Sequence, residues 1–184
     1  GKVGFDSRCH ALRARRDFTQ KLTDDVKKAN PKYGVQLGWG GGNSVPTPCS
    51  DGKHVYIWRG ETGVLSCYDL AGKQIWKKDL GVLNGGWFYD PDYEWGTASS
   101  PIIYKGMVIL QCDVQKDSFV AAFDIKTGKE LWNHKIGGHS FWSSIVYADG
   151  CCYATSQKGT TFVFTPDPTG WKPLATNDLD EHTN

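Results

Sequence analysis

The chain has 184 residues, and its 21 Lys and Arg nearly cancel its 20 Asp and Glu. The chain therefore has no basic excess that would suggest nucleic acid and no acidic tail, and no apolar run is long enough to span a bilayer. The 22 Gly and 8 Trp, against a single Met, favour an all-β fold with many turns.

Residues 1 to 37 differ in pattern from the rest of the chain. Within CHALRARRDFTQKLTDDVKKAN, residues 9 to 30, apolar side chains recur at 18, 22 and 26 opposite a charged face. This spacing predicts a helix, which Asn30-Pro31 ends. We interpret the region as a helical lead-in or insertion that packs on the main domain.

From residue 38 onward the sequence changes to short strands and turns, and three segments align: 44 to 76, 99 to 132 and 143 to 174. Each has a Ser-led strand, a two-residue turn, a second and a third strand, and a short fourth strand that carries Trp. The predicted tight turns are Asp51-Gly52, Lys105-Gly106 and Asp149-Gly150. Four short strands in about 40–45 residues are typical of a β-propeller blade.

The first two repeats end on a Trp that follows a glycine-containing turn. In AFDIKTGKELW, residues 122 to 132, Gly128 can take the positive φ that a turn between the third and fourth strands needs. We therefore expect Trp76 and Trp132 to be structural residues that pack between neighbouring blades. The third repeat departs from this pattern, because Trp171 directly follows Thr169-Gly170.

The pattern A-x-D-x-x-T-G-K-x-x-W resembles the tryptophan-docking motif of the pyrroloquinoline-quinone-type (PQQ-like) propeller repeat. Its positions here are Ala122, Asp124, Thr127, Gly128, Lys129 and Trp132. That family includes quinoprotein alcohol dehydrogenases, the propeller lipoprotein of the outer-membrane assembly machinery, and exported bacterial proteins. This sequence resembles the exported bacterial members most. The resemblance implies a propeller segment over residues 38 to 184 and a periplasmic or extracellular location.

The chain is short for a closed ring of blades. Propellers usually close with about 4–8 blades, whereas we expect three to four blades here, which is all that 184 residues can supply. An open array leaves strand edges exposed. We therefore expect the remaining blades to come from a longer chain or from self-association.

The segment WFYDPDYEW, residues 87 to 95, interrupts the repeat and is rich in aromatic and acidic residues. Its aromatic side chains either cover a blade edge or form a platform for a sugar ring or a peptide. The candidate ligand-binding residues are Trp87, Tyr89, Tyr93 and Trp95, together with His139 in the loop that follows the second repeat. The alternating carboxylates are a hard-oxygen set for Ca²⁺ that lacks the spacing of a calcium loop: Asp90, Asp92 and Glu94.

Two other features recur or stand out. The Ser pairs that open the second and third repeats, at 99–100 and 143–144, predict hydrogen bonds to the backbone within each blade rather than nucleophilic catalysis. Cys151 and Cys152 are adjacent, and in quinoprotein alcohol dehydrogenases an adjacent-cysteine disulfide stacks on the quinone. Here the pair starts a strand, where alternation sends the two side chains to opposite faces, so we favour ordinary strand cysteines.

Two functions follow from these observations. The leading hypothesis is a non-enzymatic binding or scaffolding module of an exported bacterial protein, without a cofactor. It would present loops 84–96 and 136–142 to a protein or carbohydrate partner. The alternative is a fragment of a quinoprotein dehydrogenase that depends on PQQ and calcium, for which the sequence offers Cys151, Cys152 and Asp113.

Overall fold

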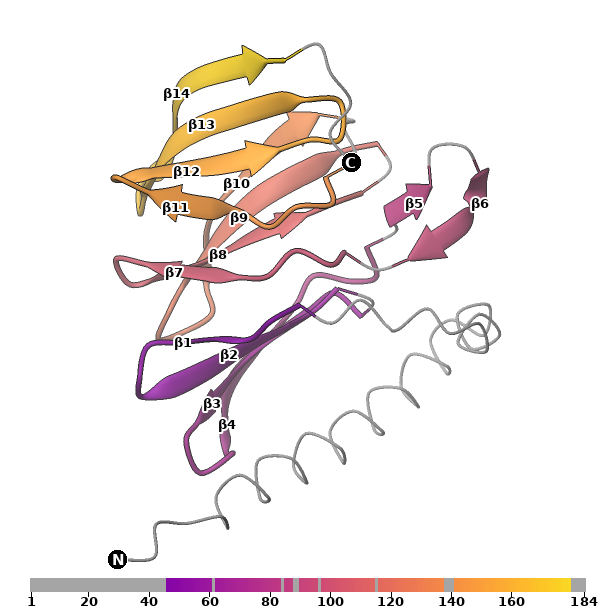
Figure 1. Cartoon of the computed structure of the whole chain (residues 1–184). Helices are drawn as coiled ribbons and strands as arrows, with labels where there is room; N and C mark the ends of the chain where they lie inside the picture. Colours follow the sequence, from indigo (N-terminus) through magenta and orange to yellow (C-terminus); the bar gives the residue numbers. More distant parts are fainter. Residues whose placement is uncertain are drawn as a thin grey trace, which may run out of the picture. The chain divides into compact units, whose positions relative to one another are not determined.

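The structure is a computed structural model of the chain (Figure 1). It describes residues 46–60, 62–83, 85–87, 90–95, 97–114, 116–137 and 141–179, and for 85–87 and 90–95 it describes the backbone alone. The predicted helix at 9 to 30 lies outside the described residues, as does the whole lead-in region 1 to 37. Residues 44 to 184 form one compact unit, to which all the described residues belong.

Strands and turns, without a helix, make up the residues that the structure describes, and most strands belong to three four-stranded antiparallel sheets. Blade 1 contains β1 (Cys49–Ser50), β2 (His54–Arg59), β3 (Val64–Asp69) and β4 (Gln74–Asp79). Blade 2 contains β7 (Ile102–Tyr104), β8 (Met107–Cys112), β9 (Ser118–Asp124) and β10 (Glu130–Gly137). Blade 3 contains β11 (Val146–Ala148), β12 (Cys151–Thr155), β13 (Thr160–Asp167) and β14 (Gly170–Asp178). The predicted all-β fold of four-stranded propeller blades is confirmed.

The antiparallel order gives every blade two distinct ends. Its first and third turns lie at one end, which we call the hairpin end, on the left in Figure 1. Its second turn and the connection to the next blade lie at the other end, which we call the connection end. No helix in the described ranges is long and apolar enough to cross a membrane.

The first turn of each blade was predicted to have two residues. Lys105-Gly106 and Asp149-Gly150 form such turns, with φ values of 42° and 79° in blade 2 and of 46° and 81° in blade 3. The prediction is wrong for blade 1, where three residues separate β1 from β2. The Asp51 carboxylate closes this longer turn, because its Oδ1 accepts hydrogen bonds from the N–H groups of Lys53 (2.9 Å) and His54 (2.7 Å).

The insertion between blades 1 and 2 is a hairpin of its own rather than a loop. Its strands β5 (Gly85–Trp87) and β6 (Asp90–Trp95) pair antiparallel as a separate two-stranded sheet. The aromatic residues of this segment have a high preference for strands, which agrees with this structure.

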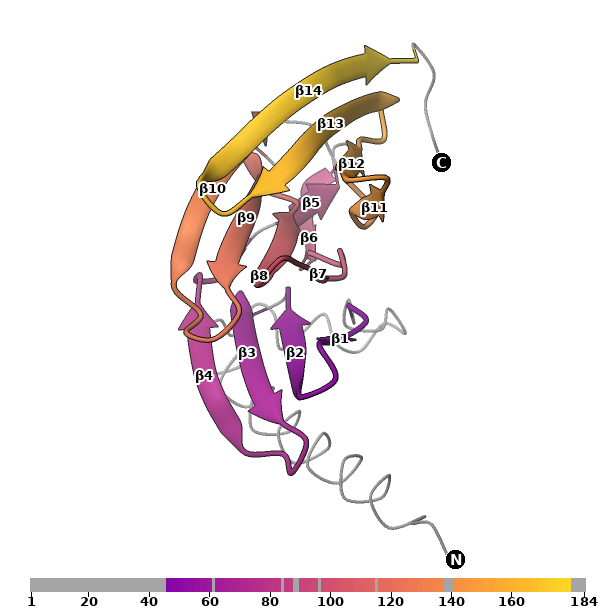
Figure 2. The same cartoon turned by 90° about the vertical axis from the view of Figure 1, so that its left-hand side faces the viewer.

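The core lies between the blades, in two apolar clusters on either side of blade 2. Val108, Leu110 and Cys112 of β8 pack toward blade 1, and Met107 and Ile109 pack toward blade 3. All six residues of β8 are buried. Blade 2 therefore lies between the other two, as Figures 1 and 2 show, and β8 reads as a nearly continuous apolar run because both of its faces are covered.

Tryptophan side chains join each blade to the next at their outer strands. The indole N–H of Trp76 in β4 donates to the carbonyl of Ile125 in blade 2 (3.1 Å), and that of Trp132 in β10 donates to the carbonyl of Asp167 in blade 3 (2.7 Å). The Trp76 ring lies so close to Gly128 that a Cβ on this glycine would be 2.5 Å from its Cε3 atom. Gly128 thus combines a φ of 68° with a backbone that the ring can approach.

Asp124 and Thr127 shape the turn on which Trp76 docks. The Asp124 Oδ1 atom accepts hydrogen bonds from the N–H of Thr127 (2.8 Å), from its hydroxyl (2.7 Å) and from the N–H of Lys126 (3.1 Å). These bonds hold the pKa of Asp124 below its ordinary value, with the Thr127 hydroxyl as the largest cause. The turn is therefore a preformed receptor for the indole of the preceding blade.

Strand register explains why the third repeat departs from the motif. Each fourth strand has a β-bulge, and in the sheet row just beyond it Trp76 pairs with Cys67, Trp132 with Ala122, and Ala175 with Val163. The docking position of blade 3 is therefore Ala175. Trp171 stacks instead on Phe164 of its own blade (ring centroids 3.8 Å apart) and on His134 of blade 2 (4.4 Å).

The repeated serines bond mainly across blades, contrary to the prediction of bonds within each blade. Thr47 N–H donates to the Ser100 hydroxyl, and Ser100 N–H donates to the Ser144 hydroxyl, each at 2.9 Å. Ser99 donates its hydroxyl proton to the Ser143 carbonyl (2.8 Å). Only Ser143, whose hydroxyl donates to Thr155 O in its own blade, follows the prediction among these four serines. The serines stand at the strand starts where consecutive blades meet, so their nearest unsatisfied partners belong to the next blade.

Gly128→Ala and Gly72→Ala form a matched pair that tests the docking contact. Both glycines have positive φ, at 68° and 85°, but a Cβ on Gly72 would meet nothing within 4 Å. Each variant strains the backbone, because alanine disfavours a positive φ, whereas Gly128→Ala also displaces the Trp76 ring. We expect Gly128→Ala to lower the free energy of unfolding by about 2–3 kcal/mol more than Gly72→Ala, measured by urea unfolding. Equal losses would show that the ring contact adds nothing.

Candidate functional site

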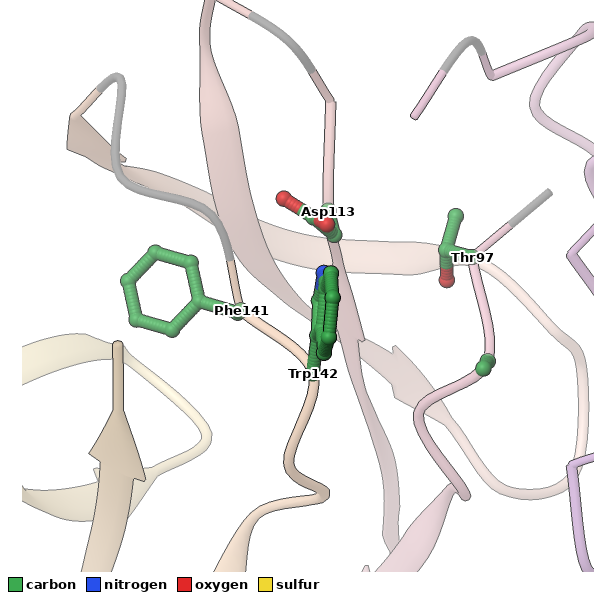
Figure 3. A pocket seen from close by; sticks show the side chains of 5 residues that line it. Thr97, Asp113, Phe141 and Trp142 are labelled. Carbon is green, nitrogen blue, oxygen red and sulfur yellow. The ribbon is translucent and has the colours of Figure 1, made fainter. Parts of the chain in front are cut away.

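A pocket of about 350 Å³ opens at the connection end, lined by Thr97, Ala98, Asp113, Phe141 and Trp142 (Figure 3). Thr97 and Ala98 precede β7, Asp113 directly follows β8, and Phe141 and Trp142 precede β11. Three segments that are distant in the sequence meet here because the connection end gathers the second turn of blade 2 and the connections into blades 2 and 3.

Asp113 is the polar group of the pocket, and only 6% of it is exposed. Its Oδ1 atom accepts a hydrogen bond from the Ser118 hydroxyl (3.0 Å), and the carboxylate also accepts one from the backbone N–H of Phe141. Burial raises the pKa of Asp113 to about 6, although these two hydrogen bonds act in the opposite direction. No Lys, Arg or His among the described residues forms an ion pair with it.

Phe141 and Trp142 are neighbours with opposite environments. Phe141 is 2% exposed and belongs to the apolar cluster between blades 2 and 3, where its ring lies 6.1 Å from that of Phe162. Trp142 is 55% exposed, and Figure 3 shows its indole beside the Asp113 carboxylate. Phe141 thus anchors the connection in the core and leaves a large aromatic side chain at the surface.

Gln111 fixes the frame of the pocket from within. It is 1% exposed and stands in β8, two residues before Asp113. Its Nε2 group donates to the Ser143 carbonyl (2.8 Å) and to the Ser99 hydroxyl (3.2 Å), which ties together the two connections that border the pocket. Its buried Oε1 atom has no hydrogen-bond partner among the described residues.

One of the two loops that were predicted to bind a partner contributes residues to the pocket. Loop 136–142 contributes Phe141 and Trp142 to the pocket, and loop 84–96 leads directly into Thr97. Tyr89 and His139 lie outside the described residues, as do the side chains of Trp87, Asp90, Asp92, Tyr93, Glu94 and Trp95. From the sequence, Asp113 was named only for the alternative function, and Trp142 was not named, although it is an aromatic residue between Phe141 and the repeated Ser pair.

Cys151 and Cys152 lie away from the pocket. They start β12 directly after the turn Asp149-Gly150, and therefore stand at the hairpin end. Both are free thiols, and Cys152 is fully buried while Cys151 is partly exposed, so their side chains face opposite sides of the strand as predicted. The structure does not bring them together with Asp113. Within the described ranges no group of three His, Cys, Asp or Glu could hold a metal ion.

Comparison with known proteins agrees with the blade architecture. The family model described as "Outer membrane protein assembly factor BamB" matches residues 18–160. The chain belongs to the PQQ-like β-propeller family. The resemblance inferred from the docking motif is thereby confirmed. A sequence comparison of this PQQ-like chain with curated proteins gave no match.

Solved structures with the same fold have low sequence identity to this PQQ-like chain. BamB from Moraxella catarrhalis is 13% identical with a TM-score of 0.53, and the match covers 73% of this chain and 35% of that one. A europium-containing methanol dehydrogenase is also 13% identical at a TM-score of 0.53, covering 69% and 31%. The computationally designed Ika4 protein is 14% identical at 0.53, covering 78% and 79%. The chain thus spans about a third of the two natural propellers.

Asp113 makes a pH-dependent contribution to stability that Asp113→Asn removes. Because its folded pKa is about 6, against an ordinary 3.8, the folded state binds the proton more tightly, and stability falls as pH rises from 4 to 7. The free energy of unfolding of Asp113→Asn should lack this fall. Relative to the unsubstituted chain, it should therefore rise by up to about 3 kcal/mol between pH 4 and pH 7. Urea unfolding at each pH measures the difference, and a gap that stays constant with pH would contradict the assignment.

Proposed function

We propose that this chain is a non-enzymatic binding module that holds a protein partner at the connection end of its propeller. The observation that carries this proposal is the exposed Trp142 beside the buried Asp113 in a pocket framed by two blade connections. The proposed module needs no bound cofactor. The family description and one similar structure name an assembly factor, which supports a protein partner and an exported, periplasmic or extracellular location.

The pocket has the chemistry of an anchor point in a protein interface. Tryptophan is among the residues that dominate binding energy when a partner covers it, and such residues lie near the centre of an interface. A volume of about 350 Å³ is at the lower end of the range for ligand pockets, about 300–1,000 Å³, and suits a side chain rather than a large ligand. The frame is already set by Gln111 and Phe141, so little ordering is required on binding.

In this proposal, further blades of a longer protein dock on blade 1. Its outer turn resembles the receptor turn of blade 2, since Asp69 Oδ1 accepts hydrogen bonds from the N–H groups of Ala71 (3.0 Å) and Lys73 (2.8 Å). Gly72 of that turn faces open space, whereas Gly128 is covered by Trp76. Blade 3 has Ala175 in place of a docking Trp, so self-association through this contact is the weaker alternative.

Photo-crosslinking in the cells that make the protein tests the proposed function. We expect benzoyl-phenylalanine at position 142 to give a discrete adduct of higher mass, because a bound partner would cover this side chain. The same group at position 126, exposed in a turn at the hairpin end, is the matched control and should give none.

The composition of the adduct distinguishes the partners. An adduct whose tryptic digest contains peptides foreign to this chain is a protein complex, as proposed, whereas an adduct whose added mass a glycosidase removes would identify a carbohydrate and contradict the proposal. Absence of an adduct at position 142, or equal adducts at both positions, would also overturn it.

A further inference from the structure

Within the described residues, the Asp113 carboxylate has no counter-charge of the kind that a buried ionised group normally has. It is 6% exposed, and its neighbours in the fold offer two neutral donors, the Ser118 hydroxyl and the Phe141 N–H. Lys135 pairs with Asp117 of the same turn at 3.3 Å, and no ion pair to Asp113 is present among the described residues. Buried charges in proteins are usually paired, which means that the pocket is electrostatically incomplete.

The surroundings of this carboxylate suit an organic cation better than a metal ion. Ca²⁺ requires about 6–8 oxygen ligands, and within the described ranges no group of three ligating side chains is present. An ammonium or guanidinium group needs one carboxylate and gains further attraction over the face of a tryptophan ring. Trp142, which is 55% exposed, lies beside Asp113 in Figure 3.

We infer that the pocket receives a cationic side chain of the partner, an arginine or a lysine, which pairs with Asp113 and lies against the indole of Trp142. This inference rests on the proposed function and names the chemistry that the same site recognises. Arginine is favoured of the two, because its guanidinium is planar, weakly hydrated and able to stack on an aromatic ring.

Binding of this kind depends on the ionisation of Asp113. Among the described residues, the groups around the carboxylate are Ser118 of β9, the backbone of Phe141, Trp142 and Thr97, and none of these titrates near pH 6. Cys112 precedes it on β8 and faces blade 1, and burial raises the pKa of this thiol, so it stays neutral. With a pKa of about 6, Asp113 is mostly charged at pH 7.5 and mostly neutral at pH 5, which should weaken binding about tenfold at the lower pH.

The test uses small probes and the full chain. Nα-acetyl-arginine amide and Nα-acetyl-lysine amide are titrated while NMR follows the indole N–H signal of Trp142, which is assigned by its loss in Trp142→Phe. Nα-acetyl-citrulline amide is the neutral control of the same shape as the arginine probe. We expect saturable shifts with the cationic probes, none with citrulline, and about tenfold weaker binding at pH 5 than at pH 7.5.

Two variants in the same turn complete the design. Asp113→Asn should abolish the shifts, whereas Asp117→Asn, at a carboxylate whose side chain is 65% exposed, should retain them. The inference would be overturned by equal shifts with citrulline, by pH-independent binding, or by binding that survives Asp113→Asn. The first two outcomes are measured on the unsubstituted chain, so they do not depend on whether a variant folds. An adduct at position 142 without any preference for cations would reject this inference alone, and cation binding without an adduct would reject only the proposed function.

Discussion

The docking of one blade on the next is the constraint on which the other features depend. At the outer strands, an indole donates to a carbonyl of the following blade, and Gly128 gives it room because it has no Cβ. At the inner strands, backbone N–H groups donate to the hydroxyls of Ser100 and Ser144. Contacts at both edges fix how far apart neighbouring sheets lie. They therefore determine which residues meet at the connection end, where two loops without regular structure acquire a defined separation.

The pocket departs from the local rules of the fold at two residues, one near the end of β8 and one directly after it. Gln111 interrupts the otherwise apolar run of β8, Asp113 follows the strand, and both side chains are buried. Gln111 compensates part of its cost by joining the connections at Ser99 and Ser143, yet leaves one oxygen without a partner among the described residues. Asp113 has a raised pKa and forms no ion pair with another described residue. Departures of this kind concentrate at functional sites in folded proteins, and here they lie side by side.

The sequence predicted the features that are local and repeated. It did not predict the features that depend on contacts between segments distant in the chain. The alternation of strands and turns and the turn at Gly128 could be predicted, because each is determined by a few neighbouring residues. The hydrogen-bond partners of the repeated serines could not be predicted, because a serine at a strand start bonds to groups of the neighbouring blade, which is distant in the sequence. The departure of Trp171 from the docking motif was visible in the sequence, but strand pairing was needed to show that Ala175 takes the docking position in blade 3. Trp142 was missed because a connecting loop carries no periodic pattern.

The location of the pocket links binding to the integrity of the blade array. In repeat proteins each unit is stabilised chiefly by its interfaces with its neighbours, and the pocket straddles the interface between blades 2 and 3. Phe141 belongs both to the apolar cluster of this interface and to the pocket wall. A partner that binds only when the two connections are in place must stabilise the docked arrangement of these blades. Conversely, the bond from Trp132 to Asp167, although at the outer strands, holds the same two blades together, so it supports the site without touching it.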